Sequence, residues 1–182
     1  MKGCAHVLAL DEGRFGLKTW LRRRWCPRGV RPPWIVEESY EWVWLYAAVE
    51  PTTGRGVFAF LPTVDSGGLE AFLGEVQRAF GTEPVGIVLD NASSHRSGQV
   101  HWPAEYRSIA FPAYSPELDP AEQIFRQMRQ ELANRIFDTR ADLETALTEA
   151  LRPFWEQPGR LQRLTGYPWW TQAVEALAAS SP

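Results

Sequence analysis

Residues 5–13 read AHVLALDEG and residues 85–91 read VGIVLDN, so two short apolar runs each stop at an acidic residue. Apolar runs of this length, bounded by turn-forming residues, are typical of strands buried inside a sheet. Residues 5–10 and 85–89 are therefore predicted to be strands, with Asp11 delivered to a loop at the end of the first. Sites in α/β sheets gather outside the carboxyl ends of strands. If the two strands are neighbours, both acids point into one crevice.

The rest of the chain surrounds these two strands with a hairpin and several helices. Aromatic and β-branched residues over 42–49 and 56–61, joined by turn chemistry at 51–54, predict the hairpin. Apolar residues at three- and four-residue spacing predict a helix over 66–80, closed by Gly81. The remaining expected elements are a short strand over 109–111 and helices over 119–136, 143–151 and 171–178. This order predicts an α/β fold, a mixed β-sheet flanked by helices.

Length and composition define the class of protein. The chain has 182 residues, 45% of them hydrophobic, and a formal net charge of −3, which fits one globular domain and excludes an intrinsically disordered chain. Its two cysteines, Cys4 and Cys26, cannot form a disulfide framework or a four-ligand zinc site. No apolar stretch approaches the ~20 residues of a membrane span, so we expect a soluble cytoplasmic protein.

A third acid, Glu122, lies one turn into the helix that follows the last short strand. Three carboxylates at one place repel one another, because a like pair ~4 Å apart costs about 4 kcal/mol at an effective dielectric of ~20. They converge only if a cation neutralises them or their pKa values rise. Oxygen ligands without a His or Cys cluster favour Mg²⁺ or Mn²⁺. Two such ions are the usual device for in-line displacement at phosphorus.

Each of the three acids also has a purely structural interpretation. Asp11 followed by Glu12 and Gly13 is consistent with a simple turn, and Asp90 followed by Asn91 with an Asx turn. Glu122 follows Asp119 and Pro120 in the pattern of a capping box, with Asp119 as N-cap, Pro120 at N1 and Glu122 at N3. A residue at N3 of a helix that starts at the sheet edge can serve both roles.

A basic segment begins directly after the first acid. Seven cations occur within 18 residues and no acid lies among them; these are Arg14, Lys18, Arg22, Arg23, Arg24, Arg28 and Arg31. Seven phosphate contacts, at ~0.9 per phosphate, would give a slope of about −6 for log affinity against log salt concentration. The alternative is a solvated basic loop. Trp20, Trp25 and Trp34 lie within or beside this segment and either stack on unpaired bases or pack in a core or lid.

Three sequence blocks resemble the catalytic domain of mariner-like bacterial insertion-sequence transposases, of the DDE superfamily. The blocks cover residues 8–17 (LALDEGRFGL) with 25–29 (WCPRG), residues 88–92 (VLDNA) with His95-Arg96, and residues 114–123 (YSPELDPAEQ). The resemblance spans residues 5–170 and implies a ribonuclease-H-like fold. It also implies that Asp11, Asp90 and Glu122 hold the metals, two Mg²⁺ or Mn²⁺ ions. His95 and Arg96 would contact the DNA, although His95 is equally consistent with a structural role.

This resemblance implies phosphodiester hydrolysis at a transposon end, followed by attack of the freed 3′-hydroxyl on target DNA. It implies a homo-oligomer on DNA, associated with the bacterial nucleoid. Two departures stand out: the family usually has Asn where Asp119 stands, and no helix-turn-helix region precedes the first strand. We therefore expect one catalytic domain over residues 1–182, from a truncated copy or one half of a split frame that works with a separate helix-turn-helix chain. The alternatives are a silent remnant that binds only DNA or a partner chain, and a metal-independent glycosidase with paired acids.

Overall fold

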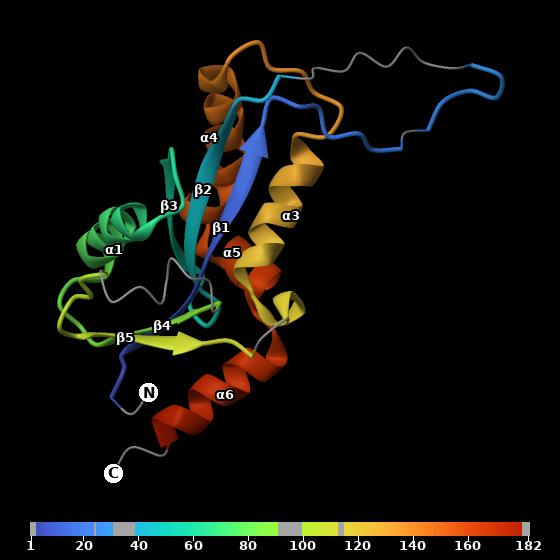
Figure 1. The fold of residues 1–182 in the computed structure, drawn as a ribbon. Coiled ribbons are helices and arrows are strands. Elements are labelled where there is room, and N and C mark those ends of the chain that lie inside the picture. Colours follow the sequence, from blue (N-terminus) through green and yellow to red (C-terminus); the bar gives the residue numbers. More distant parts are fainter. Residues whose placement is uncertain (1–2, 24, 31–38, 91–99, 113–114, 180–182) are drawn as a thin grey trace.

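A mixed five-stranded sheet forms the centre of the protein (Figure 1). The computed structural model describes residues 3–179 except 24, 31–38, 91–99 and 113–114. The strands lie in the order β3-β2-β1-β4-β5, with β1, β2 and β3 antiparallel and with β4 and β5 parallel to β1. Their bounds are β1 His6–Gly16, β2 Trp42–Glu50, β3 Arg55–Leu61, β4 Val85–Leu89 and β5 Tyr106–Ala110.

Helices cover both faces of this sheet. α1 packs on one face and α3, α4 and α5 pack on the other, while α6 lies near β5 at the lower edge of the view (Figure 1). The predicted mixed sheet with flanking helices is therefore confirmed. The helices are α1 Ser66–Phe80, α3 Ala121–Glu131, α4 Arg140–Glu156, α5 Pro158–Thr165 and α6 Pro168–Ala179, with a short 3-10 turn at Pro116–Leu118. In the described part of the chain, every helix is too short or too polar to cross a lipid bilayer.

Side-chain alternation along β1 divides the hydrophobic core into two layers. Val7, Ala9 and Phe15 pack in the layer formed with α3, α4 and α5. Leu8 and Leu10 pack in the layer formed with α1. Successive side chains of a strand point to opposite faces, so a strand that is covered on both sides carries an unbroken apolar run. This accounts for the apolar sequence of residues 7–10.

Local sequence signals define several element ends. The Asp65 side chain accepts a hydrogen bond from the Gly68 amide at 2.8 Å and caps α1. Thr139 and Asp142 form a reciprocal capping box at the start of α4. Gly81 ends α1 with φ of 73°, a left-handed conformation that glycine adopts without strain, as expected. The strand predicted over 85–89 is found with those bounds.

The first predicted strand is longer than expected, and the loop assignment for Asp11 is wrong. β1 continues through Gly16 because its second half pairs with β2, from Asp11 opposite Ala47 to Gly16 opposite Trp42. The turn interpretation of Asp11 is wrong for the same reason. Arg14, assigned to the basic segment, is likewise a strand residue. An apolar run locates a buried strand, but hydrogen bonds to a neighbouring strand continue it past the polar residues.

Two expectations for the helices are wrong, and one helix was not predicted. α3 begins at Ala121 with Pro120 as its N-cap residue, so the Asp119–Glu122 capping box is not formed. The same helix ends at Glu131, which leaves Ile136 outside it and 38% exposed. α5 was not predicted, because its eight residues bury only Leu161 and Thr165 and give no clear apolar period.

Candidate active site

The register between β1 and β4 sets two of the three predicted acids side by side. These parallel strands pair from His6 opposite Val85 to Ala9 opposite Val88. Continuing that register by two residues sets Asp11 level with Asp90. Ala9 and Val88 both pack in the layer beneath α3, and side chains two residues apart share a face. Both acids therefore belong to the α3 face of the sheet, and the expectation that their strands are neighbours is confirmed.

A close contact between β1 and α3 holds the third acid near this pair. Gly13 lies directly beneath the ring of Phe125, where a Cβ atom would be 2.6 Å from a ring carbon. Only glycine permits this approach, so the helix lies close against the strand. Glu122 is three residues before Phe125, in the first turn of α3. The start of the helix thus faces the strand near Asp11, which is partly buried.

The pKa of Asp11 responds to the charges of the other two acids. Its pKa is raised from 3.8 to about 7, chiefly because burial penalises the charged form. The negative charges of Glu12, Glu122 and Asp90 raise this pKa further. The Glu12 amide opposes the rise, because it donates a hydrogen bond of 2.8 Å to Oδ1 of Asp11. The structure thus brings Asp11, Asp90 and Glu122 within electrostatic range of one another.

Asp119 is a further acid of this cluster that the sequence analysis did not include. Its side chain is 5% exposed and accepts a hydrogen bond from the Ala121 amide at 2.7 Å. Burial and, next, the charge of Asp11 raise its pKa to about 8. Glu122 and Asp90 contribute in the same direction. The signal that could have located it was its position just before the helix that carries Glu122.

The donor set of this cluster suits a hard divalent cation. Carboxylates that raise one another's pKa values gain most from a nearby positive ion, and they are the usual ligands of Mg²⁺ and Mn²⁺. Among the described residues, however, no three His, Cys, Asp or Glu side chains come close enough together to hold a metal ion. Glu122 lies 3.6 Å from Nη1 of Arg129, an ion pair that occupies its carboxylate.

The basic residues predicted to bind DNA follow this acidic cluster along the chain. Arg14 and Lys18 are exposed near the end of β1, and Arg22, Arg23 and Arg28 are exposed on the segment that leaves the body of the protein (Figure 1). Trp20 is 42% exposed and Trp25 fully exposed, so neither is a core residue. The remaining predicted contacts lie outside the described residues; these are Arg24, Arg31, Trp34, His95 and Arg96.

The family of the chain follows from its sequence. The family model of DDE superfamily endonucleases matches residues 6–144. The chain belongs to this family. The uncharacterized protein y4pE/y4sA of Sinorhizobium fredii (strain NBRC 101917 / NGR234) is 30% identical to it over 131 residues, which cover 70% of this chain and 96% of that protein. The resemblance to DDE-superfamily transposases is confirmed.

Solved structures of DNA transposases share its fold. The Mos1 mariner paired end complex with Mn superposes with a TM-score of 0.63 at 18% identity, and covers 95% of this chain and 56% of that chain. A pre-cleavage Mos1 transpososome gives a TM-score of 0.62 at 17% identity over 95% of this chain and 56% of that chain. This chain thus has the ribonuclease-H-like fold, as expected, and spans just over half the length of the Mos1 chains it matches.

Proposed function

We propose that this DDE endonuclease is the catalytic core of a DNA transposase. It would hydrolyse a phosphodiester at the end of a DNA element and then join the freed 3′-hydroxyl to target DNA. The observation that supports this most is that the charges of Glu122 and Asp90 act on the partly buried carboxyl of Asp11 and help to raise its pKa. Carboxylates gathered at the sheet edge of a ribonuclease-H-like fold are suited to bind cations beside a phosphodiester.

Asp11, Asp90 and Glu122 would hold two Mg²⁺ or Mn²⁺ ions. Bound metals of this kind activate an attacking oxygen and stabilise the leaving oxygen in phosphoryl transfer. Mos1 paired end complexes with Mn and with Mg support the choice of ions. Glu122 would exchange its ion pair with Arg129 for the metals. Asp119 holds the start of α3 through the Ala121 amide and thereby orients the helix turn that carries Glu122.

The basic residues at the end of β1 and in the segment that follows it, together with His95 and Arg96, would hold the DNA backbone. We assign this contact to Arg14, Lys18, Arg22, Arg23, Arg24, Arg28, His95 and Arg96. Each Lys or Arg that neutralises a phosphate contributes about −0.9 to the slope of log affinity against log salt. The Mos1 structures include a strand transfer complex and paired end complexes, which supports a homo-oligomer on DNA as the working form.

Strand cleavage and strand transfer with defined element ends test this function. Asp11→Asn, Asp90→Asn and Glu122→Gln should each abolish the Mg²⁺- or Mn²⁺-dependent products. Glu149→Gln, at an exposed position of α4, is the matched control and should retain them. Full activity in all three triad variants would contradict the assignment of these acids. A chelator should stop the reaction of the wild type, whereas a glycosidase would be indifferent to it.

A second candidate is a silent remnant that binds DNA without cleaving it. The absence of a three-ligand cluster among the described residues favours this reading. It predicts DNA binding with a steep salt dependence and no cleavage with either Mg²⁺ or Mn²⁺. Products that depend on Asp11, Asp90 and Glu122 would exclude it.

A further inference from the structure

A half-open groove lies where the chain leaves β1 and enters β2. Its volume is about 550 Å³, within the ~300–1,000 Å³ range of small-ligand sites. The side chains that matter for its chemistry are two cations, three aromatic rings and one acid, namely Arg14, Lys18, Trp20, Tyr40, Glu41 and Trp42. Trp20, Tyr40 and Trp42 are 42%, 80% and 44% exposed, so their rings are accessible to a ligand.

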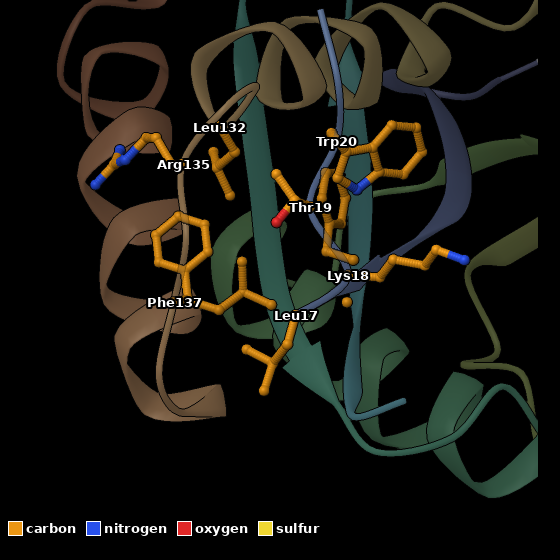
Figure 2. Close-up of a pocket in the computed structure, with 10 residues that line it drawn as sticks. Leu17, Lys18, Thr19, Trp20, Leu132, Arg135 and Phe137 are labelled. Carbon is orange, nitrogen blue, oxygen red and sulfur yellow. The ribbon is translucent and has the colours of Figure 1, made fainter. Parts of the chain in front are cut away.

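The wall of the groove is built by alternation along the chain that follows β1. Figure 2 shows Leu17 and Thr19 on the side of Phe137, and Lys18 and Trp20 extending to the opposite side. Leu17 and Thr19 are 3% and 9% exposed, so the inward side chains anchor this stretch. The Leu17 amide donates a hydrogen bond of 3.0 Å to the Glu41 carbonyl, which ties the two walls together.

Asn134 fixes the far end of the same wall. Its backbone N–H donates a hydrogen bond of 2.8 Å to the Trp20 carbonyl. Its side-chain Oδ1 accepts a hydrogen bond of 2.9 Å from the backbone N–H of Arg22, and its Nδ2 donates one of 3.1 Å to the Arg22 carbonyl. The Arg129 guanidinium lies 5.3 Å from the centre of the Trp20 ring and supports that ring from α3. The groove is therefore held in shape before any ligand arrives.

The combination of rings and cations defines the class of ligand. Exposed aromatic side chains stack on the flat faces of nucleobases, and only an unpaired base offers such a face. Arg14 lies 5.6 Å from the centre of the Trp42 ring and, with Lys18, supplies positive charge for a phosphate. Glu41 adds an acceptor for the amino group of a base. Arg14 follows Asp11 by three residues along β1, or roughly 10 Å of strand, and this odd spacing places it on the opposite face of the sheet.

We propose that this groove binds one unpaired nucleotide of the DNA substrate. The base stacks on the rings of Trp20 and Tyr40, and Arg14, which lies over the Trp42 ring, holds the phosphate together with Lys18. This inference rests on the proposed DNA-directed function and adds to it a preference for DNA with an unpaired base. The bound nucleotide would fix the register of the strand relative to Asp11.

Binding of two DNA duplexes, measured by fluorescence anisotropy in a chelator, tests the proposal without catalysis. The duplexes are identical except that one carries a single unpaired 2-aminopurine. The wild type should bind the duplex with the unpaired base more tightly. Stacking on one aromatic ring is worth about 1–3 kcal/mol, so Trp20→Ala and Tyr40→Ala should each weaken that complex by about 5- to 150-fold. Both should leave the affinity for the fully paired duplex unchanged.

Two controls make the result decisive. Trp155→Ala removes a Trp with the same exposed fraction as Trp20, 42%, from α4, and should leave both affinities unchanged. Tyr40 is so exposed that its removal cannot unfold the chain, which keeps the test valid if Trp20→Ala is unstable. Equal affinity for the two duplexes, or a preference that survives Tyr40→Ala and Trp20→Ala, would overturn the groove assignment alone. Failure to bind either duplex would overturn the proposed DNA-directed function as well.

Discussion

Replacing Asp11 by Asn should stabilise the metal-free protein at alkaline pH. The unfolded chain releases the Asp11 proton near pH 3.8, whereas the folded chain retains it until about pH 7. Between these values the folded state binds more protons than the unfolded state, so stability falls as the pH rises and levels off above about pH 7. Asn carries no charge and still accepts the hydrogen bond from the Glu12 amide, so the stability of the variant does not fall in this way as the pH rises.

The size of the effect follows from the raised pKa. The rise from 3.8 to about 7 corresponds to about 4 kcal/mol at 1.36 kcal/mol per pKa unit. Asp11 keeps part of its surface in water, which screens its charge, so we expect about 2 kcal/mol of added stability at pH 8. For a chain of this length, that corresponds to a Tm increase of roughly 4–8 °C.

Urea denaturation of wild type and Asp11→Asn in a chelator, at pH 4 and pH 8, measures this difference. The two proteins should be nearly equal at pH 4, and the variant should be more stable at pH 8. Mg²⁺ or Mn²⁺ should stabilise the wild type by binding the folded state, and the variant much less. A variant that is less stable than wild type at pH 8, or an equal gain at both pH values, would refute the burial and repulsion argument.

Three further substitutions have defined outcomes. Asp119→Asn should retain the Ala121 hydrogen bond, and its stability gain over the wild type should grow from about pH 4 to about pH 8. Urea denaturation should therefore show a larger gain at pH 9 than at pH 5. Gly13→Ala should lower the free energy of unfolding by about 1–3 kcal/mol in urea denaturation, because the added Cβ would overlap the Phe125 ring. The same substitution should displace α3 and so lower metal-dependent cleavage. Thr139→Ala should lower the free energy of unfolding by about 1 kcal/mol through loss of the α4 cap, with cleavage unchanged.

The two central strands, and the positions of Asp11 and Asp90 at their ends, were predictable because buried strands consist of apolar residues. A strand covered on both faces needs an uninterrupted run of apolar residues, so the runs at 7–10 and 85–89 are sufficient to predict two buried strands. The polar end of such a run is less informative. Asp11 lies within β1 because β2 supplies hydrogen bonds along the polar half of the strand, and pairing between strands is not encoded in either strand alone.

The groove and the role of Asp119 depend on contacts between distant segments. Asn134 fixes the wall of the groove from the connection between α3 and α4, more than a hundred residues from Arg22. Asp119 is buried because α3 packs on the sheet, and its pKa is raised by the charges of Asp11 in β1, Asp90 just after β4 and Glu122 in α3. The capping-box pattern around it was present in the sequence, but Pro120 takes the N-cap position and the pattern is not realised.

The alternation of β1 also explains how acids and cations lie close in sequence without neutralising each other. Asp11 belongs to the α3 face of the sheet, whereas Arg14, three residues later, belongs to the opposite face. The carboxyl of Asp11 therefore remains partly buried on the α3 face, and burial together with the charges of Glu12, Glu122 and Asp90 keeps its pKa raised. The formal net charge of −3 sums over the whole chain and hides this local separation of acids and cations. The face that carries Asp11 is suited to bind a cation, and the face that carries Arg14 is suited to bind a phosphate.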